Sequence, residues 1–287
     1  MRNDPVTSSA VRRYYEQNTG MMLRFGSSPQ ARTIHRALWP PEVHTLDEAL
    51  HYSHRLLHKE IERLTPASGQ TMLHIADLGC GVGASLRYLL SHLQRPTTAV
   101  GITISATQAR LAQKQIQGGW VQHRCAVVEG DFLAVPLGAG FDAVYSIEAF
   151  SHSPSALGYL TQVARLLRPG GRLMLIDDFL AQDRWCGHEW VKAYQKGWFV
   201  PNVQTVATIA ALAQQTGLQL VAQRDLTPLL HLRALPDAIA LTLLHVGQRL
   251  PIQHTLLPSS LGSMALQQCL QSGLTQYRWL VFERDST

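Results

Sequence analysis

The sequence predicts an α/β fold in which a doubly wound, mostly parallel sheet is covered by helices on both faces. The main observation is that apolar runs of strand length alternate with longer segments of helical period from Met72 onward, a pattern typical of βαβ units. Glycine turns also separate several of these runs. The chain has 287 residues, a length that fits one α/β core with added elements. Its hydrophobic content is 46%, which is ordinary for a globular protein.

The first two strand–helix units have clear boundaries. A strand over Met72–Leu78 ends at a glycine turn, after which Ala84–Leu93 is predicted to be the helix that returns across the sheet. A second strand, Thr98–Ile102, precedes a helix over Ser105–Gln117. Ser105 is a suitable N-cap for that helix, and two glycines after it end the helix.

Five further strands complete the predicted sheet. Their ranges are Cys125–Val128, Phe141–Ile147, Arg172–Asp177, Leu218–Arg224 and Gln276–Glu283. Helices are predicted over Pro154–Leu167, where a proline suits the first turn, and over Val203–Thr216. Pro-Gly-Gly at 169–171 is predicted to turn the chain into the fifth strand.

Segments outside this alternation are expected to cover the sheet. Helical stretches are predicted near 236–246 and 263–271, and we interpret them as a lid over one end of the sheet. The predicted organisation is a helical N-terminal cover (1–65), a core (66–227), a helical lid insertion (228–273) and a last core strand (274–287).

Composition argues against several classes of protein. The 25 Lys and Arg residues give a net charge of +5 but are scattered, so no nucleic-acid partner is expected. No run approaches the ~20 apolar residues of a transmembrane helix. The N-terminus lacks the apolar stretch of a secretory signal, which makes secretion an unfavoured reading. We therefore expect a cytoplasmic protein.

Cysteines and histidines give no signal for a metal. The four cysteines, at 80, 125, 186 and 269, lack the Cys-x-x-Cys spacing of a zinc or redox site and are expected to be reduced. His51, His54 and His58 would follow one polar helix face, where solvated side chains are the commoner state. No metal ligands are therefore predicted among these residues.

For partners, the sequence predicts a small-molecule substrate, and a homo-oligomer is compatible with it.

The segment Asp77-Leu-Gly-Cys-Gly-Val-Gly83 lies directly between a predicted strand and a predicted helix. Such a loop lets the backbone approach a ligand closely and directs helix N-terminal amides toward it. In a dinucleotide fingerprint the third glycine follows the second by three residues, whereas Gly83 follows Gly81 by two. Asp77 suits a bound ammonium or loop hydrogen bonds better than a pyrophosphate. The loop therefore favours a cofactor that carries an amino acid.

The segment from His74 to Gly83 resembles the first cofactor motif of class I S-adenosylmethionine-dependent methyltransferases. Gly-Asp-Phe at 130–132 and Leu-Leu-Arg-Pro-Gly-Gly-Arg-Leu at 166–173 are similar to two later motifs, so the resemblance spans about residues 70–180. It implies a Rossmann-like, seven-stranded fold and S-adenosylmethionine as cofactor. The cofactor residues that it implies in these motifs are Asp77, Gly79, Gly81, Gly83, Asp131, whose carboxylate accepts from the adenine amino group, and Phe132.

After the second strand the chain departs from many such enzymes, which place a carboxylate on the ribose hydroxyls. Gly-Ile-Thr-Ile-Ser at 101–105 resembles instead the version in tocopherol, sterol and cyclopropane-fatty-acid methyltransferases. That resemblance implies that Thr103 and Gln108 face the ribose. Alternatively, Ser105 caps a helix and Thr103 only ends a strand; both can hold together.

The segment from Tyr145 to Pro154 is similar to the Ile-Glu-Ala-x-x-His-x-Pro segment of sterol C-methyltransferases. The resemblance implies catalytic roles for Glu148 and His152. Both would lie at the carboxyl end of a central strand, where open α/β sheets gather ligands. The alternative for Glu148 is that it caps the next helix or holds a neighbouring arginine.

Aromatic residues are candidates for the substrate side. Tyr14, Tyr15 and Trp39 lie in the N-terminal segment, which closes the site in the sterol, tocopherol and prenyl diphosphate enzymes that it resembles. Trp185 and Trp198 are candidates for a substrate wall. Aromatic faces stabilise cations by about 0.5 to 2 kcal/mol each. Ordinary core packing explains the same residues equally well, as it does the shared helical face of Trp190, Tyr194 and Trp198.

These features together favour C-methylation of an alkene carbon in a hydrophobic isoprenoid: a prenyl diphosphate, a terpenoid or a prenylated metabolite. The methyl transfer would leave a carbocation, for which Glu148 is a candidate base or stabiliser. Five arginines, at 12, 13, 24, 32 and 36, could meet a diphosphate, and Mg²⁺ is expected only with such a substrate. The alternatives are O- or N-methylation of another small metabolite, and a non-catalytic cofactor-binding protein.

Overall fold

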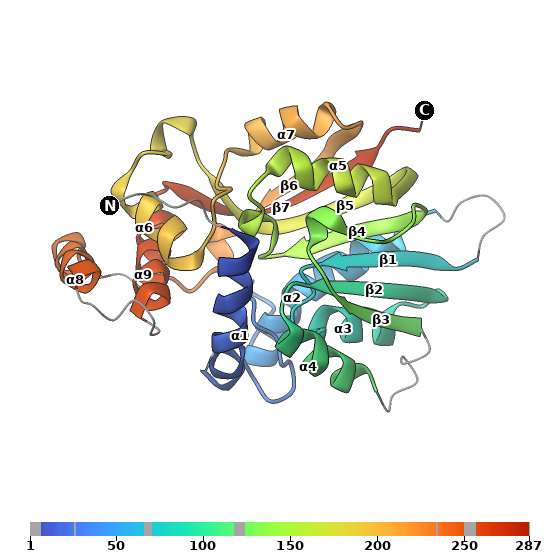
Figure 1. Cartoon of the computed structure of the whole chain (residues 1–287), viewed down its shortest axis with the longest axis horizontal. Coiled ribbons are helices and arrows are strands. Elements are labelled where there is room, and N and C mark those ends of the chain that lie inside the picture. Colours follow the sequence, from blue (N-terminus) through green and yellow to red (C-terminus); the bar gives the residue numbers. More distant parts are fainter. Residues whose placement is uncertain are drawn as a thin grey trace.

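A computed structural model describes residues 7–25, 27–65, 71–117, 124–233, 235–249 and 257–286. In these residues seven strands form one sheet in the order β3-β2-β1-β4-β5-β7-β6 (Figure 1). The strands from β3 to β5 are parallel, and β7 runs antiparallel between β5 and β6. The predicted doubly wound, mostly parallel sheet is confirmed.

The strands lie close to their predicted ranges. They are β1 (Leu73–Leu78), β2 (Thr97–Thr103), β3 (Cys125–Glu129), β4 (Phe141–Ile147), β5 (Leu167–Leu180), β6 (Leu218–Asp225) and β7 (Thr275–Arg284). β5 is longer than predicted because β7 pairs with it from Arg172 to Leu180. The Pro-Gly-Gly turn lies inside β5, next to a register shift against β4.

The helices surround the sheet. They are α1 (Ser8–Phe25), α2 (Leu46–Glu62), α3 (Ala84–His92), α4 (Ala106–Ile116), α5 (Ala156–Leu166), α6 (Glu189–Trp198), α7 (Val206–Gln214), α8 (Asp237–Arg249) and α9 (Leu257–Gln271). The predicted cap of α4 is confirmed, since the Ser105 side chain accepts from the Gln108 amide at 3.1 Å. The predicted start of α5 is wrong: Ser155 caps it, so Pro154 precedes the cap.

Alternation along the strands produces a core on each face of the sheet. In β1, Leu73 and Ile75 pack in the core that holds α2, α3 and α4. Ala76 and Leu78 point the other way, into the core that holds α5 and α7. Side chains of α6, α8 and α9 form a third apolar cluster. Figure 1 shows α1 across one end of the sheet, with these three helices beyond it.

Close helix contact holds the third cluster together. A Cβ built on Gly197 of α6 would lie 2.5 Å from the Cα of Gly262 in α9, so the two backbones cross where neither residue has a side chain.

No helix in the described ranges is both long and apolar enough to cross a bilayer.

Candidate functional site

A mostly apolar cavity of about 370 Å³ lies where β1 and β4 end. From these neighbouring strands the sheet continues outward in two directions, to β2 and to β5. This is the switch point at which open α/β sheets bind their ligands. Residues of α1, α2, α6 and α9 and of the 33–37 segment close the cavity on its other sides.

The glycine loop after β1 forms one wall. Gly79, Gly81 and Gly83 have φ angles of 95°, 53° and 80°, a region that glycine enters without strain. A Cβ on Gly79 would lie 2.2 Å from the Cβ of Ala149, and one on Gly83 would lie 3.0 Å from that of Ala112. The loop is therefore confined between the end of β4 and α4, and its backbone forms the cavity surface.

Asp77 lies beneath this loop with 2% of its surface exposed. It accepts a 2.5 Å hydrogen bond from Ser85 Oγ. Burial raises the pKa of this carboxyl to about 7, against the effect of the serine. A cationic group of a ligand would supply the counter-charge that this buried carboxylate otherwise lacks.

Thr103 and Gln108 also line the cavity, on the side of β2 and α4. Thr103 Oγ1 donates to Gln108 Oε1 at 2.8 Å, and Gln108 Nε2 donates to Thr19 Oγ1 of α1 at 3.2 Å. Ser105 caps α4 and Thr103 ends β2, while the side chains of Thr103 and Gln108 also line the cavity. Contact of these two side chains with a ribose stays a prediction.

Helix α1 is fastened over these motifs by contacts that sequence reasoning missed. Glu16 accepts from Ser105 Oγ at 2.8 Å and from the Thr107 amide at 3.1 Å. Ser8 Oγ donates to Asp131 Oδ2 at 2.7 Å. Asp131 and the neighbouring Phe132 line the cavity as well. The partners are about 90 or more positions apart, so no local pattern could have indicated them.

Glu148 follows β4 with a φ of 52°, in the left-handed region. Its Oε1 accepts from the backbone amide and Nε of Arg36, each at 3.0 Å, and from Tyr277 Oη at 2.7 Å. Oε2 has no hydrogen-bond partner among the described residues. Burial acts to raise the pKa of Glu148, but the Arg36 charge and the hydrogen bonds outweigh it and lower that pKa.

Arg36 connects Glu148 to a second carboxylate. Its Nη1 and Nη2 donate to the two oxygens of Asp178 at 3.1 and 2.7 Å, and its guanidinium lies 3.9 Å from the centre of the Tyr277 ring. Asp178 also accepts from Tyr194 Oη at 3.1 Å. The alternative reading, that Glu148 holds an arginine, thus describes a contact that is present.

Asp177, beside this network, is a cavity residue that the sequence did not indicate. It is 1% exposed and accepts from the amides of Ser151 and Asp178 at 3.0 and 2.9 Å. Burial, followed by the neighbouring Asp178 charge, raises its pKa to about 7. It reaches the cavity from β5, a strand for which only a structural role was predicted.

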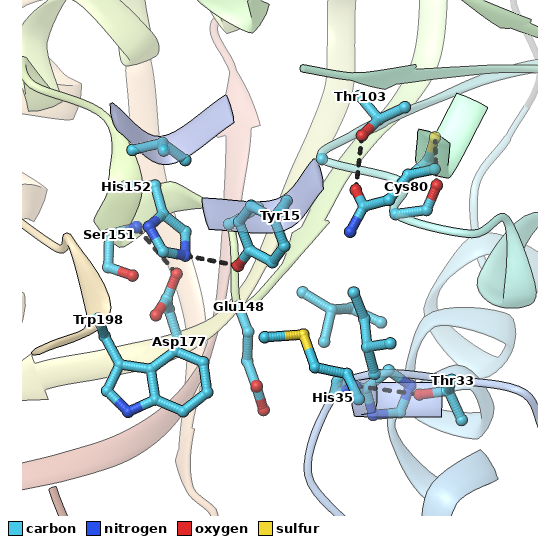
Figure 2. A pocket seen from close by; sticks show the side chains of 18 of the residues that line it. Tyr15, Thr33, His35, Cys80, Thr103, Glu148, Ser151, His152, Asp177 and Trp198 are labelled. Atoms are coloured by element: carbon cyan, nitrogen blue, oxygen red, sulfur yellow. Dashed lines mark hydrogen bonds between the residues drawn. The ribbon is translucent and has the colours of Figure 1, made fainter. Parts of the chain in front are cut away.

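His152 and Tyr15 also line the cavity, and their side chains point toward each other in Figure 2. His152 Nδ1 lies 3.1 Å from the Phe199 carbonyl, which can only accept, so Nδ1 carries the proton. Its Nε2 then accepts from Tyr15 Oη at 2.8 Å. Burial lowers the pKa of His152, which keeps the ring neutral.

Only part of the predicted aromatic wall lines the cavity. Tyr15 and Trp198 line the cavity, and both are labelled in Figure 2. Tyr14 packs behind them, 5.2 Å from the Tyr15 ring and 5.9 Å from the Trp198 ring. Trp39 stacks on His231, and Trp185 packs against the third apolar cluster.

Tyr14, Trp39 and Trp185 are absent from the cavity lining, contrary to the prediction. The Trp39 amide donates to the Leu229 carbonyl at 2.7 Å, and its ring packs against the core that holds α2, α3 and α4. Trp190 is likewise buried in the third cluster, whereas Tyr194 of the same helix face lines the cavity.

The prediction that His51, His54 and His58 follow one polar, solvated face of α2 is wrong. His54 is fully buried, with its Nε2 2.9 Å from His35 Nε2 and its Nδ1 3.0 Å from His51 Nδ1. Burial lowers the pKa of both His54 and His35. The three rings thus join α2 to the 33–37 segment that covers the cavity.

Comparison with known proteins places this site in a family context. Residues 76–175 match a family of methyltransferase domains. Over 224 residues the chain is 30% identical to O-methyltransferase rstn1 of Aspergillus nomiae, covering 77% of this chain and 93% of that protein. Over 170 residues it is 31% identical to 24-methylenesterol C-methyltransferase 2 of Oryza sativa subsp. japonica, covering 58% of this chain. The chain spans only 44% of that plant relative.

A solved structure shares the whole fold. A geranyl diphosphate methyltransferase in complex with GPP and sinefungin superimposes with a TM-score of 0.75, covering 98% of this chain and 100% of that one. The two sequences are 17% identical. This likeness supports the common architecture, including the helical elements outside the sheet.

Proposed function

The chain belongs to the class I S-adenosylmethionine-dependent methyltransferases, and from this premise we propose that it methylates an alkene carbon of an isoprenoid. The cofactor would lie over the glycine loop, with its ammonium toward Asp77. Thr103 and Gln108 would face its ribose, and Asp131 its adenine. These residues fit the cofactor because all of them line the same cavity.

When bound, S-adenosylmethionine supplies an electrophilic methyl group on its sulfonium. The protein then has to hold the acceptor carbon in line with that methyl, ~3 to 3.5 Å away. An alkene takes the methyl with its π electrons and leaves a cation on the adjacent carbon, which becomes neutral when a neighbouring C–H bond gives up its proton. The site therefore has to stabilise positive charge and accept one proton.

The observation that carries the proposal is that Glu148 and Trp198 line the same mostly apolar cavity. The apolar lining includes Val11, Met22, Ile34, Leu50, Val200 and Leu266. The free Oε2 of Glu148 is the candidate proton acceptor, and the faces of Tyr15 and Trp198 are the candidate cation stabilisers. The 31% identity to a sterol C-methyltransferase over the core supports the same reading.

Glu148→Gln tests this role. We expect C-methylation of an isoprenoid panel to fall by about 100-fold or more, because an amide cannot accept the proton, while S-adenosylmethionine affinity measured by calorimetry changes little. Glu42→Gln, at an exposed position, is the matched control and should keep full turnover. Unchanged turnover in Glu148→Gln would remove this residue from the mechanism.

O-methylation is the second candidate, and the His152–Tyr15 pair favours it. A neutral imidazole with an accepting Nε2 can take the proton of a hydroxyl acceptor that displaces Tyr15 Oη. The similarity to O-methyltransferase rstn1 points the same way. NMR of the product separates the candidates: a new C–CH3 group supports the alkene, and a methoxy group supports the hydroxyl.

A further inference from the structure

Building on the proposed function, we propose that the isoprenoid acceptor is uncharged and that the cavity discriminates against prenyl diphosphates. The cavity lining holds five carboxylates and, among the described residues, one arginine. The carboxylates belong to Asp77, Asp131, Glu148, Asp177 and Asp178. A ligand with several negative charges would enter a site whose own charges are mostly of the same sign.

Arg36, the arginine of this lining, is already paired. Its Nε, Nη1 and Nη2 all donate to Glu148 or Asp178 at 2.7 to 3.1 Å. Asp178 has only 3% of its side chain exposed. A diphosphate could use Arg36 only by taking it from these carboxylates, which would leave both of them without a counter-charge in a buried site.

No other lining residue among those described supplies a positive charge for a diphosphate. His35 and His152 line the cavity, but burial lowers the pKa of both and keeps them neutral. Arg12, Arg13, Arg24 and Arg32, the remaining diphosphate candidates from the sequence, are not in the lining. Nor do the described residues contain a group of three or more His, Cys, Asp or Glu side chains that could hold a metal between carboxylates and phosphate.

An uncharged prenyl group meets a different surface. It can lie along the apolar wall and place its double bond near Tyr15 and Trp198 without disturbing Arg36. The excess of carboxylates then becomes favourable, because the reaction develops positive charge on the substrate. The same electrostatics that oppose a diphosphate thus assist the proposed chemistry.

The test compares two ligands with the same ten-carbon chain, geraniol and geranyl diphosphate. Their dissociation constants are measured by calorimetry on the full chain with S-adenosylhomocysteine present, and for the diphosphate with and without Mg²⁺. We expect geraniol to bind at least about tenfold more tightly. Equal or tighter binding of the diphosphate under either condition overturns the inference.

Asp178→Asn sharpens the test because it removes one negative charge and one of the two oxygens that accept from Nη1 and Nη2 of Arg36. The ratio of the two dissociation constants should move toward the diphosphate by about tenfold, whereas Asp237→Asn, an exposed exchange on α8, should leave it unchanged. A ratio that does not move in well-folded Asp178→Asn contradicts the role of Arg36; if that variant does not fold, the wild-type ratio decides.

Methyl transfer separates this inference from the proposed function. If geraniol binds more tightly but no C-methylated product forms from any uncharged isoprenoid, the proposed function fails and the charge preference stands. If the diphosphate binds better and is C-methylated, the proposed function stands and the inference fails. If neither ligand binds, the inference fails, and the isoprenoid panel decides the proposed function.

Discussion

The cavity has two halves that are built in different ways. The half proposed for the cofactor, here the cofactor half, contains Asp77, the glycine loop, Thr103, Gln108 and Asp131. The half proposed for the acceptor, here the acceptor half, contains Tyr15, Arg36, Glu148, Asp178 and Trp198. In the cofactor half the main wall is backbone, and its glycine loop takes its shape from seven consecutive residues, 77–83. In the acceptor half the main contacts join charged and aromatic side chains as far as 142 positions apart, as Arg36 and Asp178 are. The first half is therefore constrained by steric fit, and the second by the balance of charge.

The largest effect is expected where the acceptor half loses its positive charge. Arg36→Met would leave Glu148 and Asp178 buried without their counter-charge, which should lower the free energy of unfolding by about 3 to 5 kcal/mol. Urea unfolding measures this. The double variant Arg36→Met/Asp178→Asn should recover part of the loss. If the single variant is as stable as the wild type, the charge balance of this half is not what holds it together.

A slightly smaller loss is expected from steric change in the cofactor half. Gly79→Ala would bring a Cβ to 2.2 Å from Ala149 Cβ at a φ of 95°, at a cost of about 2 to 4 kcal/mol. Affinity for S-adenosylmethionine should fall with it. Ala149→Gly in the same chain should relieve the clash but not the backbone strain. Gly138→Ala, which meets nothing within 4 Å, is the control; equal behaviour of Gly79→Ala and Gly138→Ala would contradict the steric account.

The same contrast explains what the sequence could predict. The sheet, the glycine loop and the Ser105 cap follow from periodicity and local residue chemistry, and all are present. Arg36 could be named only as one of five arginines, because its choice of Asp178 depends on how two distant segments meet. Trp39 was misplaced for the same reason: an aromatic residue in a cover segment has two sides on which to pack. The division of the chain into cover, core and lid stays a prediction.

His51 of α2 and Asp77 beneath the glycine loop should contribute to the pH dependence of stability with opposite signs. Burial first, then nearby positive charge, lowers the pKa of His51 from 6.5 to about 4, so the unfolded chain takes up a proton before the folded chain does, and stability falls as pH drops from 6.5 toward 4. Burial raises the pKa of Asp77 from 3.8 to about 7. The folded chain keeps this proton longer, so the Asp77 contribution falls as pH rises from 3.8 toward 7.

Variants separate the two contributions. His51→Gln should flatten the loss of stability on acidification, and Asp77→Asn should flatten the opposing loss between pH 4 and 7. Thermal or urea unfolding across this range measures both slopes. His58→Gln, on the same helix and at a half-buried position, is the histidine control. A His51→Gln profile that parallels the wild type would show that the imidazoles joining α2 to the 33–37 segment do not govern acid stability.

The smallest effect is expected at the junction of the two halves, where α1 is fastened to α4. Glu16→Gln keeps one accepting oxygen but removes the charge from its bonds to Ser105 and Thr107, at a cost of about 1 kcal/mol. Because α1 supplies Tyr15 to the acceptor half and Ser8 to Asp131 of the cofactor half, faster hydrogen exchange in α1 should accompany weaker binding on both sides. Gln17→Ala, at an exposed position of α1, should alter neither. Weaker binding of the cofactor alone would mean that α1 belongs to the cofactor half and does not link the two.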